Sequence, residues 1–309
     1  MAIHTVVPTP SKSIFLSLTF LILLSFPHSY SSEVIPQSDK ELGEVAFNFI
    51  MLEAQILCYG SLGSGLESLA PQYTGGGPSP IGAQKAILDP LTRHIFTQFC
   101  YQDIGHLRAL QGILEEPFRM PLLNYSKGVF ATYMDNAFER TLNPPFNPYA
   151  NSINYLLGLY LIYVGNSLAV GAGPMLESST FKAFLASLLG VDAGQEAIIR
   201  ALLYPVREKL VLPYDITVAE FTDRISEYRN KLGKAGLKDE GLVVPTFLGA
   251  EGKVEGNIIA GNENSTFYAR TLQEALRIVY GTGNESVPGG FFPNGLNGRL
   301  PRSFLGPGN

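Results

Sequence analysis

The stretch that decides the fold is FTQFCYQDIGHLRAL, residues 96–110. Its apolar residues recur every three or four positions, which predicts one face of an α-helix. Asp103 and His106 interrupt this apolar face three residues apart, so their side chains point the same way. An acid and an imidazole in this arrangement can bind one metal ion, as Glu-x-x-His pairs do in di-metal helical bundles. The alternative is a buried Asp–His hydrogen bond that serves only the fold.

Apolar periodicity predicts four long helices in all. They are expected over residues 38–60, 89–114, 153–170 and 178–204. The first opens with Ser38 and Glu41, the pattern of a capping box, and the second has Pro90 in its first turn. The long connection between the second and third helices is typical of a ferritin-like bundle. We therefore predict an all-α fold.

Polar residues also interrupt the apolar faces of the first and fourth helices. Glu53 does so in the first, and Asp192 and Gln195 repeat in the fourth the spacing of Asp103 and His106. Burying such groups apart from one another would cost several kcal/mol. We therefore expect these polar side chains to meet in the centre of the bundle, with Ile162 facing them from the third helix. They are Glu53, Asp103, His106, Asp192 and Gln195. Two alternatives stay open, because Glu53 could reach water at the rim and the five residues could form either a metal site or a polar network.

The third predicted helix is hydrophobic on nearly every side. The sequence has no charged residue between Arg140 and Glu177. Such a helix is either a membrane span or the core of a large domain. Scattered Asn and Gly residues, and the lack of flanking basic residues, favour the core helix.

The first 31 residues have the features of a secretory signal. Lys12 is the only charged residue before Glu33, and an apolar run over residues 14–26 is followed by small residues. We expect cleavage near Ser31 or Ser32 and a secreted, extracellular protein in the apoplast or cell wall. Three Asn-x-Ser/Thr sequons, at Asn124, Asn264 and Asn284, agree with secretion.

Cys58 and Cys100 are the two cysteines of the chain. Secretion permits a disulfide between them. If the first two helices are antiparallel and Glu53 and Asp103 lie at the same level, Cys58 and Cys100 are displaced from that level in the same direction. Cys58 points further from the helix–helix contact than Cys100, however, so free thiols remain the alternative.

The rest of the chain predicts shorter elements. Residues 61–87 are rich in Gly and Pro and are expected to contain no helix. Short helices are expected over residues 127–139, 217–232 and 271–280, the last two capped by Thr217 and Thr271. The segment 281–309 is expected to be irregular and pinned against the bundle by Phe291 and Phe292; a separate small domain and partial disorder are the alternatives. We thus divide the chain into a signal peptide (1–31), a bundle (32–205) and an extension packed on it (206–309).

The composition excludes several classes of function. The formal charge is −5 and no basic run is present, so there is no footprint for nucleic acid or an anionic membrane. A hydrophobic content of 46% excludes a disordered, hydrophilic protectant. After signal cleavage only His94 and His106 remain as histidines, which excludes a site with three imidazoles.

Several long segments resemble the plant desiccation-related proteins, which are secreted relatives of ferritins. These segments are GGGPSPIGAQKAILDPLTR (75–93), YQDIGHLRAL (101–110), NPPFNPYANSINYLLGLY (143–160), ITVAEFTDRISEYRNKLGKAGLKDEGLVVP (216–245) and VPGGFFPNG (287–295). The resemblance implies a ferritin-like fold and accumulation in drying tissue. It also implies a reduced di-metal site, because Gln195 stands where ferritin-like relatives have an imidazole and Ile162 where they have an acid. Glu196 is placed by the helical period at the edge of the apolar stripe.

Two functions follow from this resemblance. The preferred one is a non-catalytic protein that protects dehydrating tissue, with no cofactor or at most one iron or manganese ion in a degenerate site. The other is a metal-dependent oxidoreductase, an oxidase or a catalase-like enzyme, that removes reactive oxygen during drying. A weaker third is binding of a small ligand in the space of the second metal. No partner is identified; cell-wall binding and self-association both remain open.

Overall fold

The computed structural model describes residues 34–306, and the signal segment predicted over residues 1–31 lies outside them. The described residues form helices joined by loops with isolated β-bridges, which confirms the predicted all-α class. The helices of the bundle are α2 (Gln37–Leu62), α4 (Pro90–Leu114), α6 (Ser152–Ile162), α7 (Gly165–Ala172) and α8 (Ser179–Leu203). The other helices are α3 (Leu66–Leu69), α5 (Lys127–Ala137), α9 (Val218–Gly233), α10 (Leu272–Tyr280) and α11 (Arg299–Arg302).

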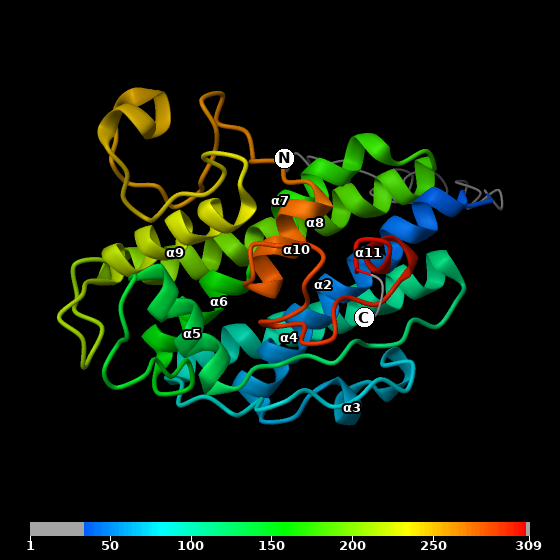
Figure 1. Cartoon of the computed structure of the whole chain (residues 1–309), viewed down its shortest axis with the longest axis horizontal. Coiled ribbons are helices and arrows are strands. Elements are labelled where there is room, and N and C mark those ends of the chain that lie inside the picture. Colours follow the sequence, from blue (N-terminus) through cyan, green and yellow to red (C-terminus); the bar gives the residue numbers. More distant parts are fainter. Residues whose placement is uncertain (1–33, 307–309) are drawn as a thin grey trace, which may run out of the picture. The chain divides into compact units, whose positions relative to one another are not determined.

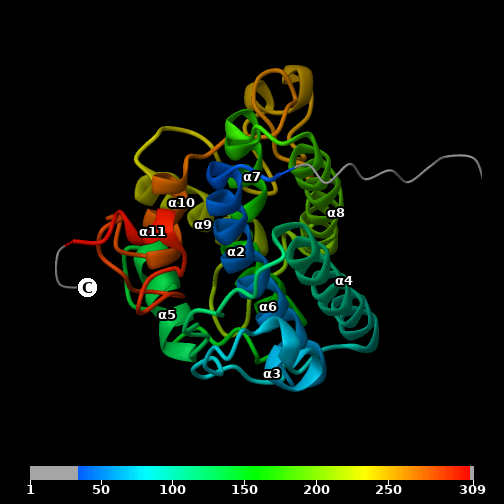
Figure 2. The same cartoon turned by 90° about the vertical axis from the view of Figure 1, so that its right-hand side faces the viewer.

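The helices of the bundle lie alongside one another (Figures 1 and 2). Helix α2 packs along α4, and α8 packs against α4, α6 and α7. Helix α2 is buried on nearly all sides along its second half, from Phe47 to Cys58. Its apolar side chains thus form the centre of the core, as those of α6 do.

The third long helix is broken, and the prediction of one continuous helix over residues 153–170 is wrong. Helix α6 ends at Ile162 because Tyr163 takes a non-helical conformation (φ −67°, ψ 88°), and α7 begins at Gly165. A Cβ atom at Gly165 would lie 3.1 Å from Glu53 Oε1, so the glycine allows the chain to pass close to that carboxylate. The break therefore lies directly beside a predicted site residue.

Two windows of the bundle are long and apolar enough to cross a membrane, Gln37–Leu62 and Ser152–Met175. In both, most of the apolar window is buried inside the protein, 83% and 67% respectively. Burial in the bundle accounts for their composition.

Helix caps follow the sequence signals except at the first helix. Thr271 and Glu274 form the predicted capping box of α10, and Thr217 accepts a hydrogen bond from the Glu220 N–H at the start of α9. The capping box predicted at Ser38 is wrong: α2 begins at Gln37 after Pro36, with no side-chain cap. A proline before the helix already fixes the chain direction, so the helix starts one residue earlier than the Ser38 signal.

The Gly- and Pro-rich segment after α2 contains short helices, so the expectation of no helix over residues 61–87 is also wrong. Helix α3 and a 3-10 turn at Pro71–Tyr73 precede the glycine run. The glycines and prolines that preclude a helix begin only at Gly75.

Buried arginines tie residues 206–306 to the bundle. Arg200 of α8 is 1% exposed and donates hydrogen bonds to the carbonyls of Glu240, Gly241, Asn257 and Ile258. Arg229 of α9 donates to the carbonyls of Tyr160 and Tyr163, at 2.7 and 3.1 Å. These carbonyls lack helical partners because α6 ends there.

The C-terminal segment is pinned as expected. Phe291 and Phe292 are fully buried, and the Phe291 ring stacks on Tyr133 of α5 with centroids 4.8 Å apart.

Candidate metal centre

Helices α4 and α8 bring an imidazole and two carboxylates together inside the bundle. His106 Nδ1 lies 3.5 Å from Asp103 Oδ1 and 3.4 Å from Asp192 Oδ1. One ligand atom from each of the three residues lies within 4.8 Å of the other two. The i, i+3 spacing of Asp103 and His106 places both on the buried face of α4, as the sequence indicated.

Three atoms of this cluster are buried without a hydrogen-bond partner among the described residues. They are Asp103 Oδ2, His106 Nδ1 and Asp192 Oδ1. Buried polar atoms are almost always paired, and leaving one unpaired costs about 1–3 kcal/mol. Three such atoms facing one another form a set of electron-pair donors that a cation would satisfy together.

Both polar atoms of the Gln195 side chain take part in hydrogen bonds within the protein. Its Nε2 donates to Asp103 Oδ1 at 3.2 Å, and its Oε1 accepts from the Tyr163 hydroxyl at 2.9 Å. Tyr163, directly after α6, therefore supplies the contact from the third helix that was expected at Ile162. Ile162 itself is buried at the end of α6, directly before Tyr163.

Glu53 completes the predicted set from α2, and Glu196 joins it. Glu53 is 4% exposed, so it is not a rim residue. Glu196 Oε2 accepts from Asn166 Nδ2 at 2.8 Å, which ties α8 to the start of α7. The sequence placed Glu196 at the edge of its stripe. Because α7 is redirected at the break, Asn166 reaches it, and the only sequence signal for this was the Gly165-Asn166 pair.

The pKa values of the carboxyl groups in this centre are raised. Burial, followed by the charges of Asp192, Asp103 and Glu196, raises the pKa of Glu53 well above its usual value. Burial and the Asp103 charge raise the pKa of Asp192 to about 7, against the lowering effect of His106. Burial also raises the pKa of Asp103. The centre thus holds more acidic groups than its single imidazole can balance.

Burial lowers the pKa of His106, but its neighbours Asp103 and Asp192 outweigh that effect, so the net shift is upward. A cation bound between these carboxylates would replace the proton that the imidazole otherwise holds.

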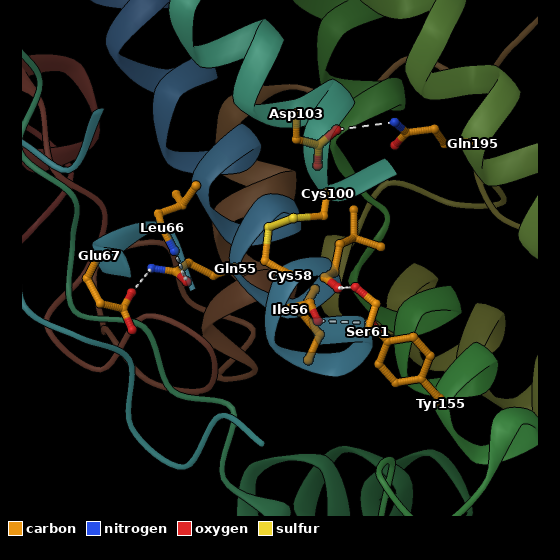
Figure 3. Close-up of a disulfide and its surroundings, with 11 residues drawn as sticks. Gln55, Ile56, Cys58, Ser61, Leu66, Glu67, Cys100, Asp103, Tyr155 and Gln195 are labelled. Carbon is orange, nitrogen blue, oxygen red and sulfur yellow. Dashed lines mark hydrogen bonds between the residues drawn. A yellow bond between two sulfur atoms is a disulfide. The ribbon is translucent and has the colours of Figure 1, made fainter. Parts of the chain in front are cut away.

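A disulfide joins the two helices that carry Glu53 and Asp103. Cys58 of α2 and Cys100 of α4 are bonded, with Cα atoms 4.9 Å apart. Figure 3 shows this disulfide. Asp103 lies about one turn further along α4, where it accepts a hydrogen bond from Gln195 of α8. The crosslink therefore fixes α2 and α4 to each other next to the centre.

The donor set fits a transition-metal ion. One imidazole with carboxylate oxygens is a usual environment for iron or manganese. Asp103, His106 and Asp192 would hold the ion, with Glu53 and Glu196 close by. Gln195, bonded through both of its polar atoms, orients Asp103 instead.

A helical bundle with buried carboxylates and an imidazole at its centre defines the ferritin-like class of proteins. This chain belongs to that family, because the family model described as a ferritin-like domain matches residues 38–205. Two relatives extend the similarity over nearly the whole chain. The chain is 50% identical over 272 residues to the ferritin-like catalase Nec2 of Nesocodon mauritianus, covering 88% of this chain and 87% of that protein. It is 46% identical over 298 residues to the desiccation-related protein PCC13-62 of Craterostigma plantagineum, covering 95% of each chain. No solved structure matches the chain.

Proposed function

We propose that this protein binds one iron or manganese ion at Asp103, His106 and Asp192 and breaks down hydrogen peroxide. The observation that carries the proposal is that ligand atoms of Asp103, His106 and Asp192 lie within 4.8 Å of one another, and that each residue has a buried atom without a hydrogen-bond partner. A purely structural network would pair these atoms in hydrogen bonds, whereas His106 Nδ1 approaches its two carboxylates only to 3.4 and 3.5 Å. The similarity to a ferritin-like catalase over 88% of the chain supports peroxide as the substrate.

The chain's own residues would perform three tasks. A bound redox metal supplies the electron transfer that converts two hydrogen peroxide molecules into two water molecules and one oxygen molecule. Asp103, His106 and Asp192 hold the ion, and Gln195 with Tyr163 fixes the orientation of Asp103. The buried Glu53 carboxyl, with its raised pKa, holds a proton beside the centre.

A non-catalytic role in desiccation protection is the second candidate. The 46% identity to a desiccation-related protein over 95% of the chain supports it, as does the replacement of an expected imidazole by Gln195. In this reading the bundle is a stable scaffold. The two functions meet if the protein removes peroxide from drying tissue.

We further propose that the protein is secreted to the apoplast or cell wall. The apolar run with Lys12 at the start of the chain, the sequons and the Cys58–Cys100 bond support this location, since disulfides persist outside the cytosol. The sequence contains no basic run, so we propose no contact with nucleic acid or an anionic membrane.

Metal analysis of protein purified without chelators tests the proposed function. We expect about one iron or manganese ion per chain, together with oxygen release from hydrogen peroxide. His106→Gln removes one donor and should lower both metal content and oxygen release at least about tenfold, since lost ligation reduces affinity by that order.

His94→Gln is the matched control, because His94 is exposed on α4, outside the centre. It should retain metal and activity. The non-catalytic role would be favoured if the purified protein holds no metal and His106→Gln lowers its stability without any other effect. Bound metal without oxygen release would keep the site and reject peroxide breakdown.

A further inference from the structure

An apolar cavity leads from the surface of the bundle to the candidate metal centre. It has a volume of about 360 Å³ and is formed by α2, α7 and α8, and residues at the start of α10 and in the α11 region complete its lining. Small-molecule sites have volumes of about 300–1,000 Å³ and mostly apolar linings, so this cavity is large enough for a ligand.

The cavity is elongated along the helices. Its wall on α2 extends from Leu42 to Glu53, and its wall on α8 from Phe181 to Asp192. Each stretch advances eleven residues, which corresponds to about 16 Å of helix. Met175, an exposed methionine, lies at the outer part of the lining. The shape suits a chain-like molecule better than a globular one.

Polar groups gather at the inner end. Among the lining residues, Glu53 and Asp192 are buried members of the metal centre, and Asn166 lies beside them. The rest of the wall is mainly Leu, Ile, Val, Ala and Phe side chains. A ligand that fills the cavity would therefore place its polar end at the centre and its apolar part along the helices.

The charges of the cavity disfavour an anionic ligand. Arg270 is the one basic residue of the lining, but two carboxylates outside the metal centre balance its charge. Its Nη2 lies 3.9 Å from Asp239 Oδ2, and its Nη1 lies 3.9 Å from Glu274 Oε1. Burying a carboxylate head group in this apolar cavity without a free basic partner would cost much more than burying a neutral hydroxyl or hydroperoxide, which could hydrogen-bond to the acidic groups at the inner end.

We propose that this cavity binds an uncharged, chain-like apolar molecule whose neutral oxygen-bearing end lies beside Glu53 and Asp192. This inference deepens the proposed function, since it adds an organic ligand to the centre assigned to peroxide. Binding itself depends on the cavity and not on peroxide chemistry, so the two can be tested apart.

Calorimetric titration of the full mature protein with 1-decanol tests the inference, with decanoate as the charged counterpart. We expect saturable binding of 1-decanol near one molecule per chain, and binding of decanoate weaker by at least about tenfold. Ala46→Phe on α2 and Ala172→Phe on α7 insert rings into opposite walls of the cavity. Each should weaken 1-decanol binding at least about tenfold.

Ala109→Phe is the matched control, because Ala109 is exposed on α4 outside the cavity, and it should bind 1-decanol as the unmodified protein does. Metal content is measured on the same samples and should be unchanged in Ala46→Phe. No 1-decanol binding, equal binding of decanoate, or unchanged binding in both cavity variants would overturn the inference and leave the proposed function intact. If 1-decanol binds to protein that neither holds metal nor releases oxygen, the proposed function fails and the cavity assignment stands.

Discussion

At the scale of single residues, the centre is notable for an imbalance of charge. One imidazole, His106, lies among four acids: Glu53, Asp103, Asp192 and Glu196. Without a cation, burial favours the protonated form of these carboxyls, as the raised pKa values of Glu53 and Asp192 indicate. A metal ion would allow them to ionise together, which explains why acids remain at positions where apolar residues would stabilise the bundle more.

A carboxylate outside the centre gives a pH-dependent prediction. Asp223 of α9 packs against Gly241, and burial, then Glu227, raise its pKa to about 6. Its usual pKa is about 3.9, so the folded protein favours the protonated carboxyl. The stability that this group contributes is complete below about pH 3.9 and is lost as pH rises through about 6. Asp223→Asn should therefore raise the free energy of unfolding by about 1–2 kcal/mol at pH 7.5 and little at pH 4.

Urea unfolding of both proteins at the two pH values provides the measurement. Asp215→Asn removes an exposed carboxylate and controls for the change in net charge. A gain of equal size at both pH values would contradict the assignment.

At the scale of helices, the break between α6 and α7 organises the site. It turns Tyr163 toward Gln195, brings Asn166 to Glu196 and opens space at Gly165 beside Glu53. Arg229 stabilises the break, because it donates to the carbonyls left free at the end of α6 and pairs with Asp239, with Nη2 2.9 Å from Oδ1.

Removing this arginine should therefore destabilise the protein. Arg229→Met would leave the Tyr160 and Tyr163 carbonyls unpaired and Asp239 without its closest cation. We expect a loss of about 3–5 kcal/mol in the free energy of unfolding, the usual cost of breaking a buried pair.

Thermal and urea unfolding measure this loss. Arg224→Met changes an exposed arginine of the same helix, so it should stay within about 0.5 kcal/mol of the unmodified protein. Similar losses in both variants would show that Arg229 has no special role at the break.

The same break marks the limit of what could be predicted from the sequence. Periodicity placed Glu53, Asp103, His106, Asp192 and Gln195 on inward faces, because each interrupts an apolar stripe within one regular helix. It could not place Tyr163, Asn166 and Glu196, since their contacts depend on a change of direction within a uniformly apolar segment. The Cys58–Cys100 bond was left open for a related reason: helical phase alone does not reveal how α2 rotates against α4.

At the scale of the whole molecule, exposure separates the three sequons. Asn264 and Asn284 are exposed. Asn124 is partly buried, its N–H donates to the Phe291 carbonyl and its Oδ1 accepts from the Ser126 N–H. We expect glycans on Asn264 and Asn284 and none on Asn124, in protein whose mature N-terminus falls between residues 30 and 34.

Peptide mass spectrometry of protein purified from its native tissue, before and after enzymatic removal of N-glycans, tests both expectations. Asn264→Gln and Asn284→Gln should each remove one glycan, while Asn124→Gln should leave the mass pattern unchanged. An intact Met1 with three unmodified asparagines would contradict secretion.

The buried arginine of α8 has a consequence for how the chain can be divided. The family match ends at residue 205, five residues after Arg200. The carbonyls that surround this guanidinium belong to residues 240–258, beyond that limit. A fragment that stops at residue 205 would keep the cation and lose the groups that solvate it. The end of the family match is thus not a structural boundary. A piece to be expressed alone, fused to another protein or exchanged between relatives should include the carbonyls up to residue 258.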